Sequence, residues 1–123
     1  MPKRIIIAED NESLRESYVE CFRLLKGDLE IEAVSSGEEL LERMKNKRYD
    51  LVMTDNDLGN GINGFEVITR IRESNKTIPI LMVSGTEGII EKFAVQSGAT
   101  GYLVKKNMSL GKIKEEIIDA YLR

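Results

Sequence analysis

Short apolar strands alternate with amphipathic helices along the whole chain of 123 residues. Five runs rich in apolar residues are predicted as strands, at 4–9, 29–34, 51–54, 78–83 and 101–104. Apolar residues then recur about every four positions, which predicts helices over 11–25, 36–44, 65–71, 89–98 and 110–121. Strands that alternate with helices of this length require right-handed crossovers and a parallel sheet covered on both faces. The pattern predicts one α/β domain over residues 1–123.

Local signals mark some of the helix ends. Ser35 or Ser36 precedes two glutamates and is expected to cap the second helix. Gly27 follows the apolar pattern of the first helix and is expected to close it as a C-cap glycine.

Composition excludes several classes of function. The chain is 41% hydrophobic and 32% charged with a formal net charge of −3, which offers no basic surface for nucleic acid or anionic lipid. No apolar run approaches the roughly 18 residues of a membrane span. The absence of histidine excludes histidine-based catalysis and metal binding. The single cysteine, Cys21, has no disulfide partner in the chain, which fits a reduced, cytoplasmic location.

Polar residues follow four of the five predicted strands. Glu9 and Asp10 follow the first strand, Asp55 the third, Ser84 the fourth and Lys105 the fifth. In open parallel sheets, ligands bind beyond the carboxyl ends of the strands, where the strand order reverses. The order 2-1-3-4-5 would place these residues side by side and leave the second strand, which ends without a charged group, at the margin.

The three carboxylates of Glu9, Asp10 and Asp55 would then converge on one edge of the sheet. Carboxylates a few ångströms apart repel, and one shifts toward protonation unless a cation joins them. Mg²⁺ prefers oxygen ligands and is commonly held by one or two carboxylates together with water and phosphate. The sequence therefore predicts a divalent-cation site at this edge.

From Arg4 to its last helix, the chain resembles the receiver domain of two-component response regulators, in particular the chemotaxis regulators. The resemblance implies a flavodoxin-like (βα)5 three-layer sandwich with strand order 2-1-3-4-5. Its motifs are the acidic pair Glu9-Asp10, Asp55 at the end of Asp50-Leu51-Val52-Met53-Thr54-Asp55, Ser84 in Val83-Ser84-Gly85, and Lys105 at the end of Gly101-Tyr102-Leu103-Val104-Lys105.

The resemblance also implies a function and a set of site residues. Asp55 would accept a phosphoryl group from a sensor histidine kinase or a histidine phosphotransfer protein. The chain would catalyse only its own phosphorylation and dephosphorylation, and would not otherwise be an enzyme. The implied residues are Asp10, Asp55 and the backbone carbonyl of Asp57 as Mg²⁺ ligands, Glu9 contacting Mg²⁺ through water, and Ser84 and Lys105 contacting the phosphoryl group.

The same resemblance implies a conformational switch. Ser84 would move toward the phosphoryl group, and Tyr102 would rotate inward behind it. Both movements would repack the surface of the fourth helix, fifth strand and fifth helix, where a downstream effector protein would bind. Neither nucleic acid nor a membrane is expected as a direct partner. The chain would act as a stand-alone regulator or as the receiver part of a longer protein.

Three positions depart from the usual family pattern. Lys106 follows Lys105 where the family usually has a proline in a cis bond, and a cis bond before a non-proline residue costs roughly 2.5–4 kcal/mol. The peptide bond between Lys105 and Lys106 could therefore be either trans or cis. Gly59 stands where proline is common, and the loop before Gly64 is one residue longer. These departures leave open a second reading, a receiver-like binding platform that works without phosphorylation.

Two rival enzyme and cofactor classes fit the sequence less well. Asp55-Asn56-Asp57 resembles the Asp-x-Asp of haloacid-dehalogenase-type phosphatases, but that class places the motif after the first strand. A flavodoxin-like flavin binder would need hydroxyl and glycine residues around a phosphate after the first strand. Glu9 and Asp10 at that position would repel a phosphate.

Overall fold

The computed structural model describes residues 2–85 and 89–123 and contains a five-stranded parallel sheet. The strands are β1 (Arg4–Ala8), β2 (Glu30–Val34), β3 (Leu51–Asp55), β4 (Ile80–Ser84) and β5 (Gly101–Val104). Their order across the sheet is β2-β1-β3-β4-β5. The predicted fold class and strand order are confirmed.

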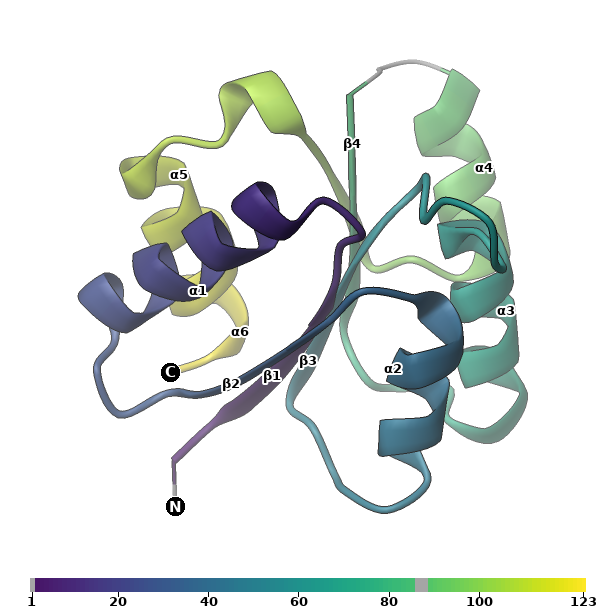
Figure 1. The fold of residues 1–123 in the computed structure, drawn as a ribbon, viewed down its shortest axis with the longest axis horizontal. Helices are drawn as coiled ribbons and strands as arrows, with labels where there is room; N and C mark the ends of the chain where they lie inside the picture. The colour runs from purple at the N-terminus through teal and green to yellow at the C-terminus, as the bar shows by residue number, and fades with distance from the viewer. Residues whose placement is uncertain (1, 86–88) are drawn as a thin grey trace.

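Helices cover both faces of this sheet (Figure 1). They are α1 (Glu12–Leu25), α2 (Gly37–Met44), α3 (Gly64–Ser74), α4 (Ile89–Ser97), the 3₁₀ turn η1 (Lys105–Asn107), and the C-terminal run α5 (Leu110–Ile113), η2 (Lys114–Ile118) and α6 (Asp119–Tyr121). One core packs α1 and the C-terminal run against the sheet, and it includes Ile5, Phe22 and Ile117. The other packs α2, α3 and α4 against the opposite face and includes Ile6 and Ile68. Ile5 and Ile6 enter different cores because successive strand side chains point to opposite faces.

Side-chain caps fix the start of several helices. The Oγ atom of Ser36 accepts a hydrogen bond from the Glu39 N–H at 3.1 Å, so of the two predicted caps it is Ser36 that begins α2. The expectation for Gly27 is wrong. Helix α1 ends at Leu25 and is capped by Lys26, whose N–H donates to the carbonyl of Phe22, and Gly27 does not adopt a positive φ. This end needs no left-handed residue because Lys26 itself leaves the helix with an extended φ of −151°.

The C-terminal helix is less regular than its apolar spacing predicts. A π-helical turn, η2, lies between the α-helical segments α5 and α6. Ile113 and Ile117 on this run are buried in the core that contains α1. None of the helices in residues 2–85 and 89–123 is long and apolar enough to cross a bilayer.

The register of the strands brings their carboxyl ends to one edge. Asp55 is the last residue of β3 and pairs with Val83, and Ser84 ends β4 beside Val104. Glu9 follows β1, and its N–H donates to the carbonyl of Val34 at 3.0 Å. The polar residues predicted at the strand ends therefore lie at neighbouring backbone positions along one edge of the sheet.

Candidate functional site

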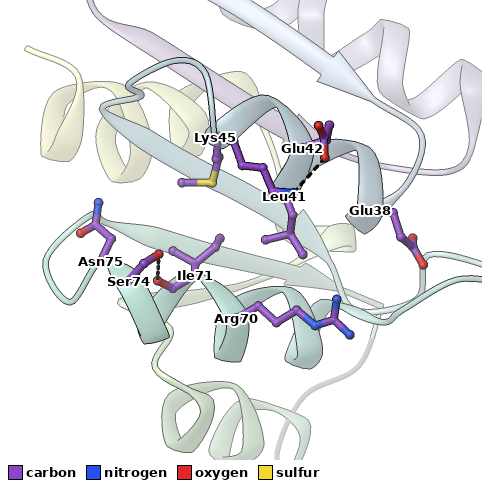
Figure 2. A pocket seen from close by; sticks show the side chains of 9 residues that line it. Glu38, Leu41, Glu42, Lys45, Arg70, Ile71, Ser74 and Asn75 are labelled. Atoms are coloured by element: carbon purple, nitrogen blue, oxygen red, sulfur yellow. Dashed lines mark hydrogen bonds and ion pairs between the residues drawn. The ribbon is translucent and has the colours of Figure 1, made fainter.

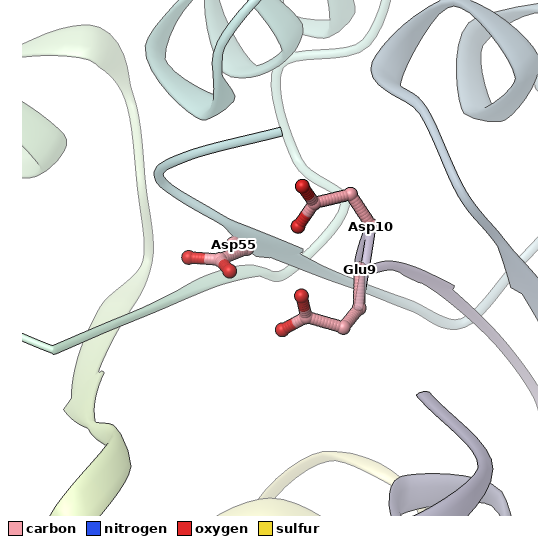
Figure 3. A group of neighbouring side chains, drawn as sticks. All are labelled: Glu9, Asp10 and Asp55. Carbon is pink, nitrogen blue, oxygen red and sulfur yellow. The ribbon is translucent and has the colours of Figure 1, made fainter. Parts of the chain in front are cut away.

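Three carboxylates converge at the carboxyl edge of the sheet. Glu9, Asp10 and Asp55 each place one oxygen within 4.8 Å of the others, and Figure 3 shows them facing a common space. Glu9 is only 1% exposed and Asp55 only 6%, whereas Asp10 is exposed to solvent. The predicted convergence is confirmed by this geometry. Two of the three negative groups are thus held away from bulk water.

Lys105 faces this cluster from the start of η1. Its Nζ atom lies 2.7 Å from Asp55 Oδ2 and 3.3 Å from Glu9 Oε1, and its side chain is 31% exposed. Partial burial by itself would lower the pKa of Lys105. The hydrogen bond to Asp55 and the nearby carboxylate charges outweigh burial, and the pKa is raised. Lys105 is therefore firmly cationic and partly balances the cluster.

Glu9 is the most deeply buried member of the cluster and has a raised pKa. Its Oε2 atom accepts a hydrogen bond from the Asn11 N–H at 3.1 Å, whereas its buried Oε1 atom has only the ion pair with Lys105 at 3.3 Å and no hydrogen bond among the described residues. Burial raises the pKa of Glu9 from 4.5 to about 7, with a further contribution from the charge of Asp55. Buried carboxylate oxygens are normally satisfied, so this atom fits a site for water or a cation.

The carboxylates form one wall of a cleft of about 370 Å³. It is lined by Glu9, Asp10, Asn11, Asp55, Asn56, Asp57, Ser84, Gly85 and Lys105. These residues include every metal-binding and phosphoryl-contacting residue that the sequence suggested. Tyr102 does not line the cleft. It lies half-buried on β5 and packs against the core beneath α3 and α4.

The backbone of the acidic pair is held by residues that the sequence analysis missed. Arg15, one turn into α1, donates from its guanidinium to the carbonyl of Glu9 at 2.8 Å and to that of Asp10 at 3.5 Å. Asn11 caps α1 by accepting from the Leu14 N–H at 2.9 Å. The signal in the sequence was an arginine five and six residues after two adjacent acids.

The loop after Asp55 and the turn after Lys105 show the departures from the family pattern. Gly59 has a φ of +76°, a left-handed conformation that glycine adopts without strain. A Cβ atom there would lie 3.3 Å from Asp10 Oδ2. The described residues contain no cis peptide bond, so the bond between Lys105 and Lys106 is trans.

Replacing Gly64 by alanine is expected to destabilise the fold by about 1–3 kcal/mol, because overpacked sites force the backbone to shift. A Cβ atom at Gly64 would collide with the backbone oxygen of Asp55 and lie 2.8 Å from Met82 Cε. Urea unfolding measures the loss. Gly27→Ala is the matched control, because its Cβ would meet only the carbonyl of Arg23 at 3.9 Å. Equal stabilities of the two variants would contradict the prediction.

Comparisons with known proteins agree with this arrangement. A model of the response regulator receiver domain family matches residues 5–118. The transcriptional regulatory protein AfsQ1 of Streptomyces coelicolor is 30% identical over 123 residues, which cover 100% of this chain and 50% of that protein. CiaR of Streptococcus pneumoniae, also a transcriptional regulatory protein, is 32% identical over 103 residues, which cover 83% of this chain and 44% of that protein. The chain therefore spans about half the length of these relatives.

Solved structures share the fold. The chemotaxis response regulator CheY4 of Vibrio cholerae superposes with a TM-score of 0.85 at 23% identity, covering 97% of this chain and 98% of that one. A CheY-like receiver domain protein of Methanospirillum hungatei gives a TM-score of 0.87 at 21% identity, covering 98% and 94%. With the family match over nearly the whole chain, these observations establish that the chain belongs to the response regulator receiver domain family.

Proposed function

We propose that this receiver domain accepts a phosphoryl group on Asp55 in a reaction that requires Mg²⁺. The supporting observation is the cleft in which the buried carboxylate of Asp55 lies beside two other carboxylates, a lysine and a buried hydroxyl. The donor is a sensor histidine kinase or a histidine phosphotransfer protein. The bond from phosphorus to the donor nitrogen breaks as a bond to a carboxylate oxygen of Asp55 forms.

The residues of the cleft fit Mg²⁺. Asp10 and Asp55 offer carboxylate oxygens close together, and Glu9 has the buried oxygen without a hydrogen-bond partner. Asp10, Asp55 and the backbone carbonyl of Asp57 are the proposed direct ligands, with Glu9 acting through water. When bound, Mg²⁺ neutralises charge shared between the acceptor and the phosphoryl oxygens.

The remaining residues of the cleft act on the phosphoryl oxygens. Lys105 already lies 2.7 Å from Asp55 and supplies a positive charge on that side. Ser84 offers a buried hydroxyl at the end of β4, and Gly85 beside it adds no side chain. Asp55 itself is the nucleophile. The protein's part in the reaction is thus positioning and electrostatic stabilisation.

Phosphorylation would be read out on the surface of α4, β5 and the C-terminal helical run. Ser84 and Tyr102 are the proposed switch residues, because they lie on neighbouring strands that connect the cleft to this surface. Leu110 on α5 is 46% exposed, which supplies apolar area for an effector protein, whereas Phe93 on α4 is 49% exposed and packs edge-on against Phe65 of α3. The module is proposed to act in the cytoplasm, where the free thiol of Cys21 remains reduced.

Incubation with a small phosphodonor such as acetyl phosphate tests the proposal. The intact mass should rise by one phosphoryl group in the presence of Mg²⁺ and should not rise in EDTA. A phosphatase would instead hydrolyse a generic phosphoester continuously, and a flavin binder would retain a yellow cofactor. Absence of any Mg²⁺-dependent mass increase, with the donor shown to be active on another receiver domain, would refute the proposal.

A further inference from the structure

Glu38 connects α2 to the loop that follows Asp55. It lies in the first turn of α2, and its Oε2 atom accepts a hydrogen bond from the Ile62 N–H at 2.9 Å, across 24 residues of sequence. That hydrogen bond lowers the pKa of Glu38, so the acceptor is a charged carboxylate at neutral pH. Hydrogen bonds to charged acceptors are stronger than those to neutral ones. Glu38 therefore makes a specific, charge-assisted hydrogen bond to the loop, in addition to its place in the first turn of α2.

The loop and α2 approach so closely at this contact that two positions, Gly37 and Gly61, have no room for a side chain. A Cβ atom at Gly61 would collide with the carboxylate of Glu38, lying 2.6 Å from Oε2. A Cβ atom at Gly37 would lie 2.9 Å from Cγ1 of Ile62 and would collide with Val67. The loop thus approaches α2 closely through both its backbone and the side chain of Ile62. Gly61 belongs to the stretch that the sequence analysis identified as one residue longer than the family pattern.

This loop reaches the candidate site at two points. The Asp57 N–H donates to Asp55 Oδ1 at 3.3 Å, and Gly59 lies against the carboxylate of Asp10. The other hydrogen bonds made by the N–H groups of residues 57–62 in the described chain stay within the loop or return to Asp55. The bond to Glu38 therefore ties the end of the loop, two residues before α3, to α2. It adds to the bond in which the Gly64 N–H donates to the carbonyl of Asn56 at 3.0 Å. Glycine-rich loops lose much conformational entropy when they are ordered, so such an anchor has a large effect on geometry.

We infer that Glu38 is a positioning residue that fastens the loop after Asp55 to α2 and so holds Asp57 and Gly59 in place beside Asp55 and Asp10. The inference rests on the proposed function for the consequence that loss of this contact weakens Mg²⁺ binding. Its structural part, the ordering of the loop, stands independently of any bound ion.

Glu38 also lies at one end of a surface groove between α2 and α3. Figure 2 shows the groove, of about 580 Å³, with Glu38 at the end nearest the loop and Glu42 farther along the same helix. Glu42 pairs with Lys45 at 3.1 Å, and within the part of the chain that the structure describes it makes no hydrogen bond or ion pair with the loop. Glu42→Ala is thus a matched control, because it removes the same charge from the same helix and groove.

The test compares Glu38→Ala, Glu38→Gln, Glu42→Ala and the native chain in two measurements. Amide hydrogen exchange of Ile62, followed by NMR without metal, should accelerate about tenfold in Glu38→Ala, as expected for loss of a hydrogen bond to a charged group. Titration calorimetry with MgCl₂ should show affinity weakened about three- to tenfold. Glu38→Gln keeps an acceptor oxygen and should restore most of both values. Glu42→Ala should match the native chain in both.

Gly61→Ala supplies a second, independent route to the same contact. Its Cβ should displace the Glu38 carboxylate, so the variant should speed Ile62 exchange as Glu38→Ala does. The double variant Glu38→Ala/Gly61→Ala should be no worse than either single variant, because both remove one shared contact. Additive effects in this cycle would overturn the inference.

The outcomes separate the inference from the proposed function. Native Mg²⁺ affinity and native Ile62 exchange in Glu38→Ala would overturn the positioning role and leave the phosphoacceptor function intact. Accelerated exchange with unchanged Mg²⁺ affinity would overturn the link between the loop and the metal site. A native chain that does not bind Mg²⁺ at all would count against the proposed function, while the exchange data would still decide whether Glu38 orders the loop.

Discussion

An Asp55→Asn chain is expected to take up no phosphoryl group under conditions where the native chain takes up one. The amide of asparagine is not a nucleophile toward phosphorus, whereas its size and its oxygen match those of aspartate. The oxygen can still accept from Lys105, which lies 2.7 Å from the native carboxylate, so the cleft should stay assembled. Intact mass after incubation with acetyl phosphate and Mg²⁺ measures the uptake.

Asp28→Asn is the control for this loss. Asp28 lies in the turn after α1, its side chain is largely exposed, and its one ion pair within residues 2–85 and 89–123 is with Lys26 at 3.4 Å. This variant should be phosphorylated as the native chain is. Uptake by Asp55→Asn, with fragmentation placing the group on Asp10 or Glu9, would mean that a different carboxylate of the cluster is the acceptor.

In the absence of divalent metal, the native chain is expected to lose stability as pH rises from about 4.5 to about 7. Burial raises the pKa of Glu9 in the folded state to about 7, against an ordinary value of 4.5. Between these values the folded state holds a proton that the unfolded state has released, so the free energy of unfolding falls with rising pH. The shift corresponds to at most about 3 kcal/mol, reached by pH 8.

The pKa values of Lys105 and Tyr18, which also face Glu9, lie above this window. The pKa of Lys105 is raised, and burial followed by the charge of Glu9 raises the pKa of Tyr18 to about 12. The proposed Mg²⁺ site uses charged carboxylates, so MgCl₂ should stabilise the fold more at pH 8 than at pH 5. Urea unfolding at both pH values, with EDTA or with MgCl₂, measures the effect.

Glu9→Gln is the corresponding control, because it cannot ionise at this position. Its stability in EDTA should change less between pH 5 and pH 8 than that of the native chain. A native chain whose unfolding free energy rises over this range would show that Glu9 is already charged at low pH, with Lys105 balancing it fully.

The sequence alone was sufficient for the features that depend on local periodicity and on topology. Short apolar runs, with two-residue alternation at 29–34, predicted the five strands, and the near four-residue spacing predicted the five main helices, because the helical period follows from backbone geometry. Parallel connectivity then required the strand ends to share an edge. That step predicts a shared edge for Glu9, Asp10, Asp55, Ser84 and Lys105, and the structure places all five in one cleft.

Other features depended on contacts between distant residues, which only the tertiary structure decides. The extended φ of Lys26 ends α1 without a left-handed Gly27, and the π-helical turn η2 interrupts a helix whose apolar spacing is regular. The anchoring of the loop by Glu38 joins residues 24 apart, and an exposed glutamate in a first helical turn carries no local sign of it. The burial of Glu9 behind Lys105, 96 positions away in the chain, depends likewise on packing. Local sequence patterns determine which helices and strands form. The pairing of side chains from different elements depends on the free energy of the complete folded structure.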